Sequence, residues 1–204
     1  MIIAVDPGHG GDDPGATGID PEDSTHRVTE AELNWTLAGW IKLILEEEGH
    51  SAAVTRQGLE DGPSLAVRAK AAAGCHCLVS IHHNAAESPG ARGFEIFVHK
   101  PEDGEVRERD MALASLILEA CRPTLDVWWI PLRNPPIKAD VDWASRGRLT
   151  LLAEAEVPAC LIEICFMSNP LELLAALQTG FQVQMAQAIT RGIIRFGKEV
   201  LHVL

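Results

Sequence analysis

The chain lacks any hydrophobic run of membrane-spanning length, and basic residues are in the minority. Lys and Arg number 17 against 29 Asp and Glu, which gives a formal net charge of −12. A charge of that sign repels phosphate backbones and anionic lipid headgroups, so we expect no nucleic-acid partner and no membrane insertion. The apolar run from Met1 to Val5 is too short for a signal peptide and has no basic flank. With an odd number of cysteines, five, the sequence predicts a protein made in a reducing cytoplasm with free thiols.

Internal repeats, low-complexity tracts and linkers are absent as well. Hydrophobic residues make up 47% of the 204 residues, which is typical of a folded globular protein. A chain of this length can bury a sizeable core in one α/β domain. We therefore expect a single domain over residues 1–204, with no prediction of its oligomeric state.

Segments typical of strands and of helices alternate along the chain. This order predicts an α/β fold with a mostly parallel twisted sheet and helices on both faces. The expected strands cover residues 2–5, 51–56, 77–82, 93–99 and 159–165, with residues 125–130 as a sixth candidate.

The helix after the first strand has the clearest sequence signals. Thr29 and Glu32 fit a capping box, an apolar stripe follows, and Gly49 ends the helix. Further helices are expected over residues 64–73, 106–121, 143–156 and 181–200, and a short one opens at Asn169-Pro170. Between residues 100 and 148, three prolines at positions 131, 135 and 136 predict a long irregular connection.

Polar residues close two of the expected strands. His9 lies in the glycine-rich turn Asp6-Pro7-Gly8-His9-Gly10-Gly11, and His82-His83-Asn84 end the strand at residues 77–82. Open α/β folds place ligands at the carboxyl edge of the sheet, where such side chains meet. Alternation sends His82 and His83 to opposite faces, so we predict His82 as a metal ligand with His9. His83 and Asn84 are predicted to contact either the metal ligands or the substrate. A surface-loop histidine and a structural histidine are the alternative interpretations.

Two glutamates stand where an acid is costly without compensation. Glu30 falls on the apolar stripe of the first helix, and Glu163 interrupts an apolar strand. We predict Glu30 as the third metal ligand and Glu163 as the proton-transfer residue beside it. The alternatives are a favourable acid at a helix N-terminus for Glu30 and an edge strand with one wet face for Glu163.

Two imidazoles and a carboxylate around one point are typical of a zinc site in which one coordination position stays open for water or substrate. One Zn²⁺ per chain is therefore expected. The segment Cys75-His76-Cys77 is too tightly spaced for a usual zinc clip, which favours packing. Trp128-Trp129 is compatible with a sugar-stacking platform and equally with core packing.

These residues together resemble the zinc-dependent N-acetylmuramoyl-L-alanine amidases, the family of bacterial cell-separation amidases and phage lysins. The resemblance covers nearly the whole chain and is carried by the His9 turn, Gly15-Ala16-Thr17-Gly18, Glu30 with Asn34, Thr55-Arg56, Leu65 with Arg68, Ser80 to Ala85, Gly93-Phe94-Glu95, and Pro158 to Asn169. It implies a single α/β catalytic domain with His9, Glu30 and His82 as zinc ligands and Glu163 as the catalytic residue. His83 stands where the family usually has alanine, and Cys165 where it usually has glycine.

The resemblance also implies a substrate and a setting. The expected reaction cleaves the amide between the lactyl group of muramic acid and L-alanine in peptidoglycan. Without an export signal, the chain is more similar to a phage or prophage lysin that reaches the wall after holin-type release than to a secreted autolysin. The alternative is a catalytic domain without its flanking segments. The alternatives are a zinc peptidase or other amidohydrolase on the same scaffold, and a peptidoglycan-binding module without turnover.

Overall fold

A central sheet organises residues 1–102, 104–142 and 147–203, which the computed structural model describes. Its six strands lie in the order β4-β1-β5-β8-β6-β7. They are β1 (Ile2–Pro7), β4 (Ser51–Val54), β5 (Cys77–Asn84), β6 (Phe94–Val98), β7 (Leu132–Ala139) and β8 (Ala159–Phe166). The neighbouring strands β4, β1, β5 and β8 are parallel to one another. β6 is antiparallel to β8, and β7 is parallel to β6. The prediction of a mostly parallel α/β fold is confirmed.

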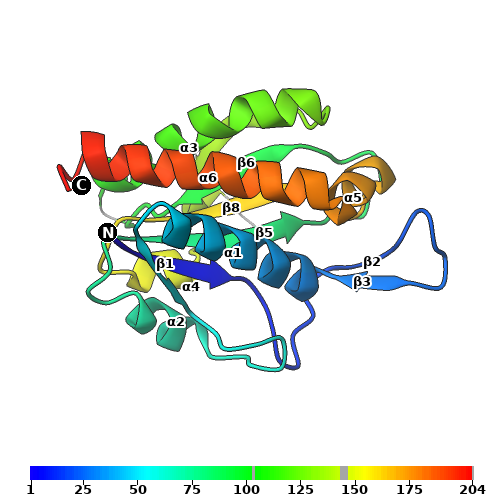
Figure 1. Cartoon of the computed structure of the whole chain (residues 1–204), viewed down its shortest axis with the longest axis horizontal. Helices are drawn as coiled ribbons and strands as arrows, with labels where there is room; N and C mark the ends of the chain where they lie inside the picture. Colours follow the sequence, from blue (N-terminus) through cyan, green and yellow to red (C-terminus); the bar gives the residue numbers. More distant parts are fainter. Residues whose placement is uncertain (103, 143–146, 204) are drawn as a thin grey trace.

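Helices cover both faces of this sheet (Figure 1). On one side lie α1 (Glu30–Glu47), α3 (Glu108–Val127), α5 (Pro170–Leu177) and α6 (Thr179–Glu199). On the other lie α2 (Leu65–Ala71) and α4 (Thr150–Glu154). Along β5, Val79 and Ile81 belong to the core on the α1 side, whereas Leu78 belongs to the core on the α2 side. By alternation, His82 faces the α2 side and His83 the α1 side.

The first helix forms as the sequence predicts. The side chain of Thr29 accepts a hydrogen bond from the backbone N–H of Glu32, and the Glu32 side chain accepts one from the backbone N–H of Thr29. Just beyond the helix, Gly49 adopts a φ of 79°, which suits a residue without Cβ. The capping box and the glycine stop are both confirmed. The helix therefore starts at Glu30, next to the end of β1.

The strand predicted at residues 125–130 is wrong, because α3 continues to Val127. Leu113, Ile117, Cys121 and Leu125 recur every four residues and are all buried, so one helix face keeps packing past Pro123. The helix predicted at residues 143–156 is shorter. It begins at Thr150 after Gly147, whose φ of 61° is not helical, and residues 143–146 lie outside the described residues.

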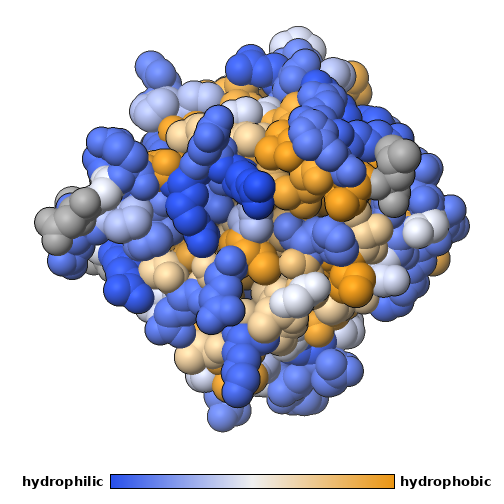
Figure 2. All heavy atoms as spheres, turned by 90° about the vertical axis from the view of Figure 1, so that its left-hand side faces the viewer, coloured by the Kyte–Doolittle hydropathy of each residue, from blue (hydrophilic) through white to orange (hydrophobic). Residues whose placement is uncertain are grey.

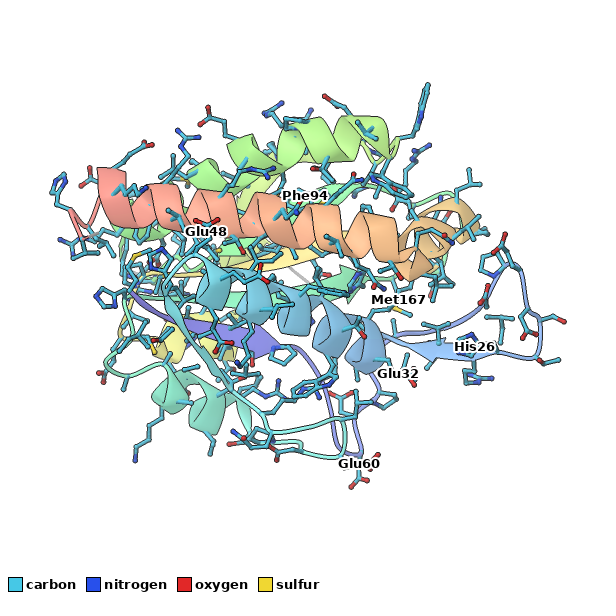
Figure 3. The ribbon with its side chains drawn as sticks, in the orientation of Figure 1. His26, Glu32, Glu48, Glu60, Phe94 and Met167 are labelled. Carbon is cyan, nitrogen blue, oxygen red and sulfur yellow. The ribbon has the colours of Figure 1, made fainter. Side chains whose placement is uncertain are left out.

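The irregular connection that the prolines predicted between residues 100 and 148 is also wrong, because β7 forms there after the helix. Pro135 and Pro136 lie inside β7, and the Asn134-Pro135 peptide is cis. β7 is an edge strand that pairs with β6 alone. Proline, which has no backbone N–H group, is tolerated there because the open side of the strand has no neighbour to bind. A short hairpin of β2 (Thr17–Ile19) and β3 (Arg27–Thr29) was not predicted. It projects from the body with His26 beside it (Figure 3).

The carboxyl ends of β1, β5 and β8 meet at one edge of the molecule, on the right in Figure 1. Figure 2 shows the opposite end, where hydrophilic side chains lie between the hydrophobic ones. None of the helices in the described part of the chain combines the length and the apolar character that crossing a membrane requires.

Candidate metal centre

His9 is presented by a turn that buried arginines hold in place. His9 itself has a φ of 62°, an uncommon left-handed conformation for a residue with a Cβ. Arg68 donates to the carbonyls of His9 (2.6 Å) and Pro7 (2.8 Å), and Arg56 donates to the carbonyl of Pro7 (3.0 Å). Asp6 anchors Arg68 in turn, at 3.2 Å. Buried charge-assisted hydrogen bonds from the two arginines therefore hold the strained turn in place.

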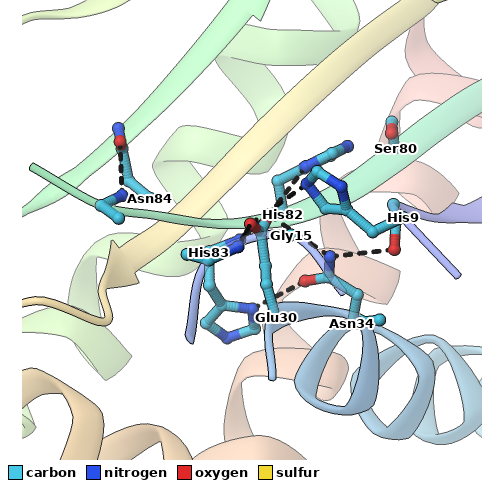
Figure 4. A network of polar contacts seen from close by, with 12 residues as sticks. His9, Gly15, Glu30, Asn34, Ser80, His82, His83 and Asn84 are labelled. Atoms are coloured by element: carbon cyan, nitrogen blue, oxygen red, sulfur yellow. Dashed lines mark hydrogen bonds and ion pairs between the residues drawn. The ribbon is translucent and has the colours of Figure 1, made fainter. Parts of the chain in front are cut away.

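Glu30 lies buried between the two imidazoles (Figure 4). Its Oε1 is 2.9 Å from His82 Nδ1, and its Oε2 is 3.1 Å from His9 Nε2. The backbone N–H groups of His83 (3.2 Å) and Ala16 (2.9 Å) donate to the same two oxygens. The helix start thus brings the carboxylate to the end of β1 and β5, as the sequence predicts.

These three side chains fit a divalent cation. His9, Glu30 and His82 each offer a ligand atom, and these atoms all lie within 4.8 Å of one another. Neighbouring glycines make this spacing possible: a Cβ on Gly15 would lie 2.6 Å from Glu30 Oε2, and one on Gly8 would lie 2.2 Å from His82 Nε2. Two imidazoles and a carboxylate are a donor set typical of a zinc site with an open position.

The electrostatics of the cluster favour a charged carboxylate. Burial alone would raise the pKa of Glu30, but hydrogen bonds with His82 and His9 outweigh it and hold this pKa well below its usual range. Burial likewise would lower the pKa of His9, but contacts with Glu30 and Asp13 raise it. The buried carboxylate of Glu30 therefore stays negatively charged, which is the form that binds a cation.

Glu163 lies beside this cluster on β8. It pairs in register with His82 of the neighbouring parallel strand, so the two side chains share the α2-side face. One cavity of about 700 Å³ is lined by Glu163 and by His9, Glu30 and His82. The structure thus gathers all four residues that the sequence assigns to the reaction.

The two residues predicted as substrate contacts take different places. His83 is only 3% exposed, and its Nδ1 lies 2.8 Å from Asn34 Oδ1 on α1. Both residues line the cavity, and Asn84 donates through Nδ2 to Glu95 Oε1 at 2.8 Å. A substrate contact by either residue remains a prediction.

Sequence reasoning assigned no role to three partners of these residues. Asp13 Oδ2 lies 2.8 Å from His9 Nδ1, which orients the imidazole from behind. Asn34 contacts Glu30 and His83, and Glu95 pairs directly with Glu163 across β6 and β8. Two local signals could have found them, the four-residue spacing of His9 and Asp13 and that of Glu30 and Asn34.

The remaining sequence motifs lie outside the cluster. Among the described residues, His9, Glu30 and His82 are the one group with metal-binding spacing, so Cys75-His76-Cys77 does not form another. Trp128 packs edge-on against Phe181 at 5.4 Å between ring centroids. Trp129 is 84% exposed, and its carbonyl accepts a hydrogen bond from Arg92.

A mostly parallel sheet that gathers two imidazoles, a buried carboxylate and a neighbouring glutamate at its carboxyl edge has the architecture of a mononuclear metal hydrolase. A family model described as N-acetylmuramoyl-L-alanine amidase matches residues 3–195. The chain belongs to this family.

Individual relatives are similar over most of the chain. It is 28% identical to the germination-specific N-acetylmuramoyl-L-alanine amidase of Bacillus subtilis, over 97% of this chain and 80% of the relative. It is also 28% identical to N-acetylmuramoyl-L-alanine amidase AmiC of Neisseria meningitidis, over 96% of this chain and 52% of AmiC, so it spans about half of that protein. The solved catalytic domain of CwlV from Bacillus (Paenibacillus) polymyxa var. colistinus superposes with a TM-score of 0.79 at 26% identity, over 100% of this chain and 99% of the domain.

Proposed function

We propose that the chain is a zinc-dependent N-acetylmuramoyl-L-alanine amidase, with residues 1–204 as its single catalytic domain. It cleaves the amide between the lactyl group of muramic acid and L-alanine of the stem peptide. The observation that carries this proposal is the convergence of His9, Glu30 and His82 within 4.8 Å, with Glu163 in register beside His82. Membership of the amidase family supports the substrate class.

His9, Glu30 and His82 hold one Zn²⁺ in this proposal. When bound, the ion polarises the scissile carbonyl and lowers the pKa of a coordinated water. Asp13 keeps the imidazole of His9 oriented, and the backbone N–H groups on Glu30 keep its carboxylate in place. The ligands are thus held before substrate arrives, which limits the rearrangement that catalysis requires.

Glu163 is the proton-transfer residue. Its carboxylate takes a proton from the attacking water as the water oxygen bonds to the lactyl carbonyl carbon. It then gives this proton to the alanine nitrogen as the C–N bond breaks. The products are a free lactyl carboxyl group and a stem peptide with a free N-terminal alanine.

The space around the ligands supports a substrate that extends to both sides. The cavity beside Glu163 adjoins a second one of about 370 Å³, and both are lined by His9 and His82. The second cavity is lined partly by Leu65, Leu151 and Leu161. One side can therefore receive a polar part of the substrate and the other a more apolar part.

Product analysis of digested peptidoglycan tests this function. The zinc-loaded chain is expected to release muramic lactyl carboxyl groups and peptides that begin with alanine, detected by mass spectrometry. New termini within the stem peptide would instead indicate a zinc peptidase. Binding to the wall without any product would indicate a peptidoglycan-binding module.

A lysin role is a further part of the proposal: origin in a phage or prophage, and access to the wall after holin-type release. The competing interpretation is a bacterial autolysin, since the relatives named above belong to bacteria. A reading frame next to holin and phage structural genes supports the lysin, and one among sporulation or division genes contradicts it.

A further inference from the structure

Three basic side chains lie beside β6, next to the proposed catalytic glutamate. They are Arg92, which precedes β6, and Arg133 and Lys138 of β7, and we call them the basic strip. The chain as a whole carries a net charge of −12, so a local group of cations stands out against its surroundings. Such a group attracts an anionic ligand.

The basic strip reaches Glu163 through one intervening residue. Glu95 of β6 pairs directly with Glu163 of β8 in the antiparallel register, so both side chains lie on the same face. Lys138 Nζ forms an ion pair with Glu95 Oε2, and Arg133 Nε lies 3.7 Å from the same oxygen. Arg133 on β7 is therefore two strands away from Glu163 on β8, and its guanidinium group reaches back to Glu95 on the strand between them.

A second buried carboxylate supports the other end of the basic strip. Glu172 accepts hydrogen bonds from the backbone N–H groups of Gly93 (3.0 Å) and Phe166 (2.8 Å). Arg92 Nε lies 3.7 Å from its Oε1. Since these ion pairs are long, the guanidinium groups keep N–H donors that a ligand can use.

Exposure differs sharply between the two arginines and the anions. The side chains of Glu95 and Glu172 are each 2% exposed, whereas those of Arg92 and Arg133 are 44% and 41% exposed. The anions thus lie beneath the surface and fix the arginine stems. What the surface presents to a ligand is the guanidinium groups.

We propose that the basic strip binds the α-carboxylate of the D-glutamate that follows L-alanine in the stem peptide. This inference rests on the proposed function, because it takes peptidoglycan as the substrate. The carboxylate is free because the peptide continues from the γ-carboxyl group, and a guanidinium group can bind it in bidentate fashion.

The distances are compatible with this assignment. Two residues of extended peptide span about 7 Å. Neighbouring strands are about 4.8 Å apart, which places β7 about 10 Å from β8 with β6 between them. The guanidinium group of Arg133 shortens this distance, because it reaches back to Glu95 on β6. The chain should therefore prefer stems with an acidic second residue over stems in which this carboxylate is an amide.

Calorimetric titration of two muropeptides tests the preference without turnover. The titrated protein is the zinc-loaded Glu163→Gln chain. One ligand is N-acetylmuramoyl-L-alanyl-D-glutamate, and the other is its D-isoglutamine counterpart, which differs only in the amidated carboxylate. We expect the acid to bind about tenfold more tightly, since one charge-assisted contact distinguishes the two ligands. Arg133→Gln in the same background should remove this preference by weakening the acid alone.

Two further variants make the result specific. Arg109→Gln removes a positive charge at the exposed N-terminal end of α3. The helix is about 30 Å long, and its other end lies near Trp129, which Arg92 contacts. This variant should leave the preference unchanged. Arg92→Gln should reduce the preference and serves in place of Arg133→Gln if that variant does not fold. Equal binding of both ligands, or of neither, overturns the inference, as does an equal loss for both ligands in Arg133→Gln.

Hydrolysis by the wild-type chain separates this inference from the proposed function. If the wild type cleaves both muropeptides but the Glu163→Gln chain binds them equally, only the inference about the basic strip fails. If binding discriminates but the wild type releases no alanine-terminated peptide, the proposed function fails and the strip remains a carboxylate-binding site.

Discussion

The imidazole of His83 is joined to the side-chain oxygen of Asn34, with Nδ1 and Oδ1 2.8 Å apart. The amide nitrogen of Asn34 donates to the carbonyl of Gly8 at 3.2 Å and approaches Glu30 Oε1 at 3.5 Å. With that nitrogen engaged as donor, Oδ1 is the acceptor and His83 Nδ1 carries the hydrogen. His83 and Asn34 are therefore positioning residues that hold Glu30 and the turn before His9.

Asn34→Leu should weaken zinc binding without unfolding the chain. The substitution removes the bonds to Gly8 and Glu30, and loss of such an outer contact typically costs 10–100-fold in metal affinity. Competition with a chromogenic chelator measures the dissociation constant. Thr36→Val, at an exposed position of the same helix, is the matched control and should leave it unchanged. Equal zinc affinity in Asn34→Leu and the wild type would show that Asn34 does not position the site.

His83 should make the zinc-free chain less stable in mild acid. Burial lowers the pKa of His83 to about 4, despite the opposing charge of Glu30. A histidine with a depressed folded-state pKa stabilises the fold above its unfolded pKa, about 6.5, and this contribution is lost as the pH falls towards 4. The loss amounts to roughly 3 kcal/mol at most.

Urea unfolding of wild type and His83→Gln between pH 4 and 7 checks this prediction. The wild type should lose more free energy of unfolding than the variant as the pH falls, because the variant has no imidazole to protonate there. Parallel pH profiles for the two proteins would refute the buried neutral histidine.

Gly15→Ala should disrupt the metal centre by steric contact. Its Cβ would meet Glu30 Oε2 and His9 Cδ2, both at 2.6 Å. Gly49→Ala is the control, because Gly49 shares the positive φ (79° against 66°) but has nothing within 4 Å of the added atom. Both variants should lose about 1 kcal/mol or more of stability from backbone strain. Only Gly15→Ala should lose zinc affinity in the chelator assay, and equal zinc affinity in both variants would contradict the steric role.

Glu163→Gln should separate metal binding from chemistry. The amide is nearly isosteric but cannot take a proton from water, and general acid–base catalysis contributes about 10²–10⁴-fold to a rate. We expect peptidoglycan hydrolysis, followed as turbidity loss, to fall by that factor while the zinc content stays the same. A variant that clears cell walls at the wild-type rate would exclude Glu163 from the reaction.

Local sequence patterns predicted the parts of the site that lie at the ends of strands and helices. His9, His82 and Glu163 could be brought together because parallel strands end at the same edge, and the capping box of Thr29 located Glu30. Local patterns do not indicate which strands become neighbours in the sheet, or whether a neighbouring pair is parallel or antiparallel. The antiparallel placement of β6, which sets Glu95 opposite Glu163, follows from the sheet order as a whole.

The errors in the fold have the same origin. The sequence at residues 125–130 is apolar enough for a strand, but its role is decided by the face of α3 that packs in the core, on which Leu125 is buried. Pro135 and Pro136 argue against a central strand, yet β7 lies at the edge of the sheet, where proline is tolerated. Both outcomes depend on neighbours that are distant in sequence.

Zinc stoichiometry by elemental analysis tests the metal centre most directly. The purified chain, incubated with zinc and dialysed, should retain one ion, and Glu163→Gln should retain the same amount. His9→Ala, Glu30→Ala and His82→Ala should each remain folded by circular dichroism and lose the ion. Retention of a full equivalent of zinc by all three variants, or no zinc on the wild-type chain, would contradict the assignment of these side chains as the metal ligands.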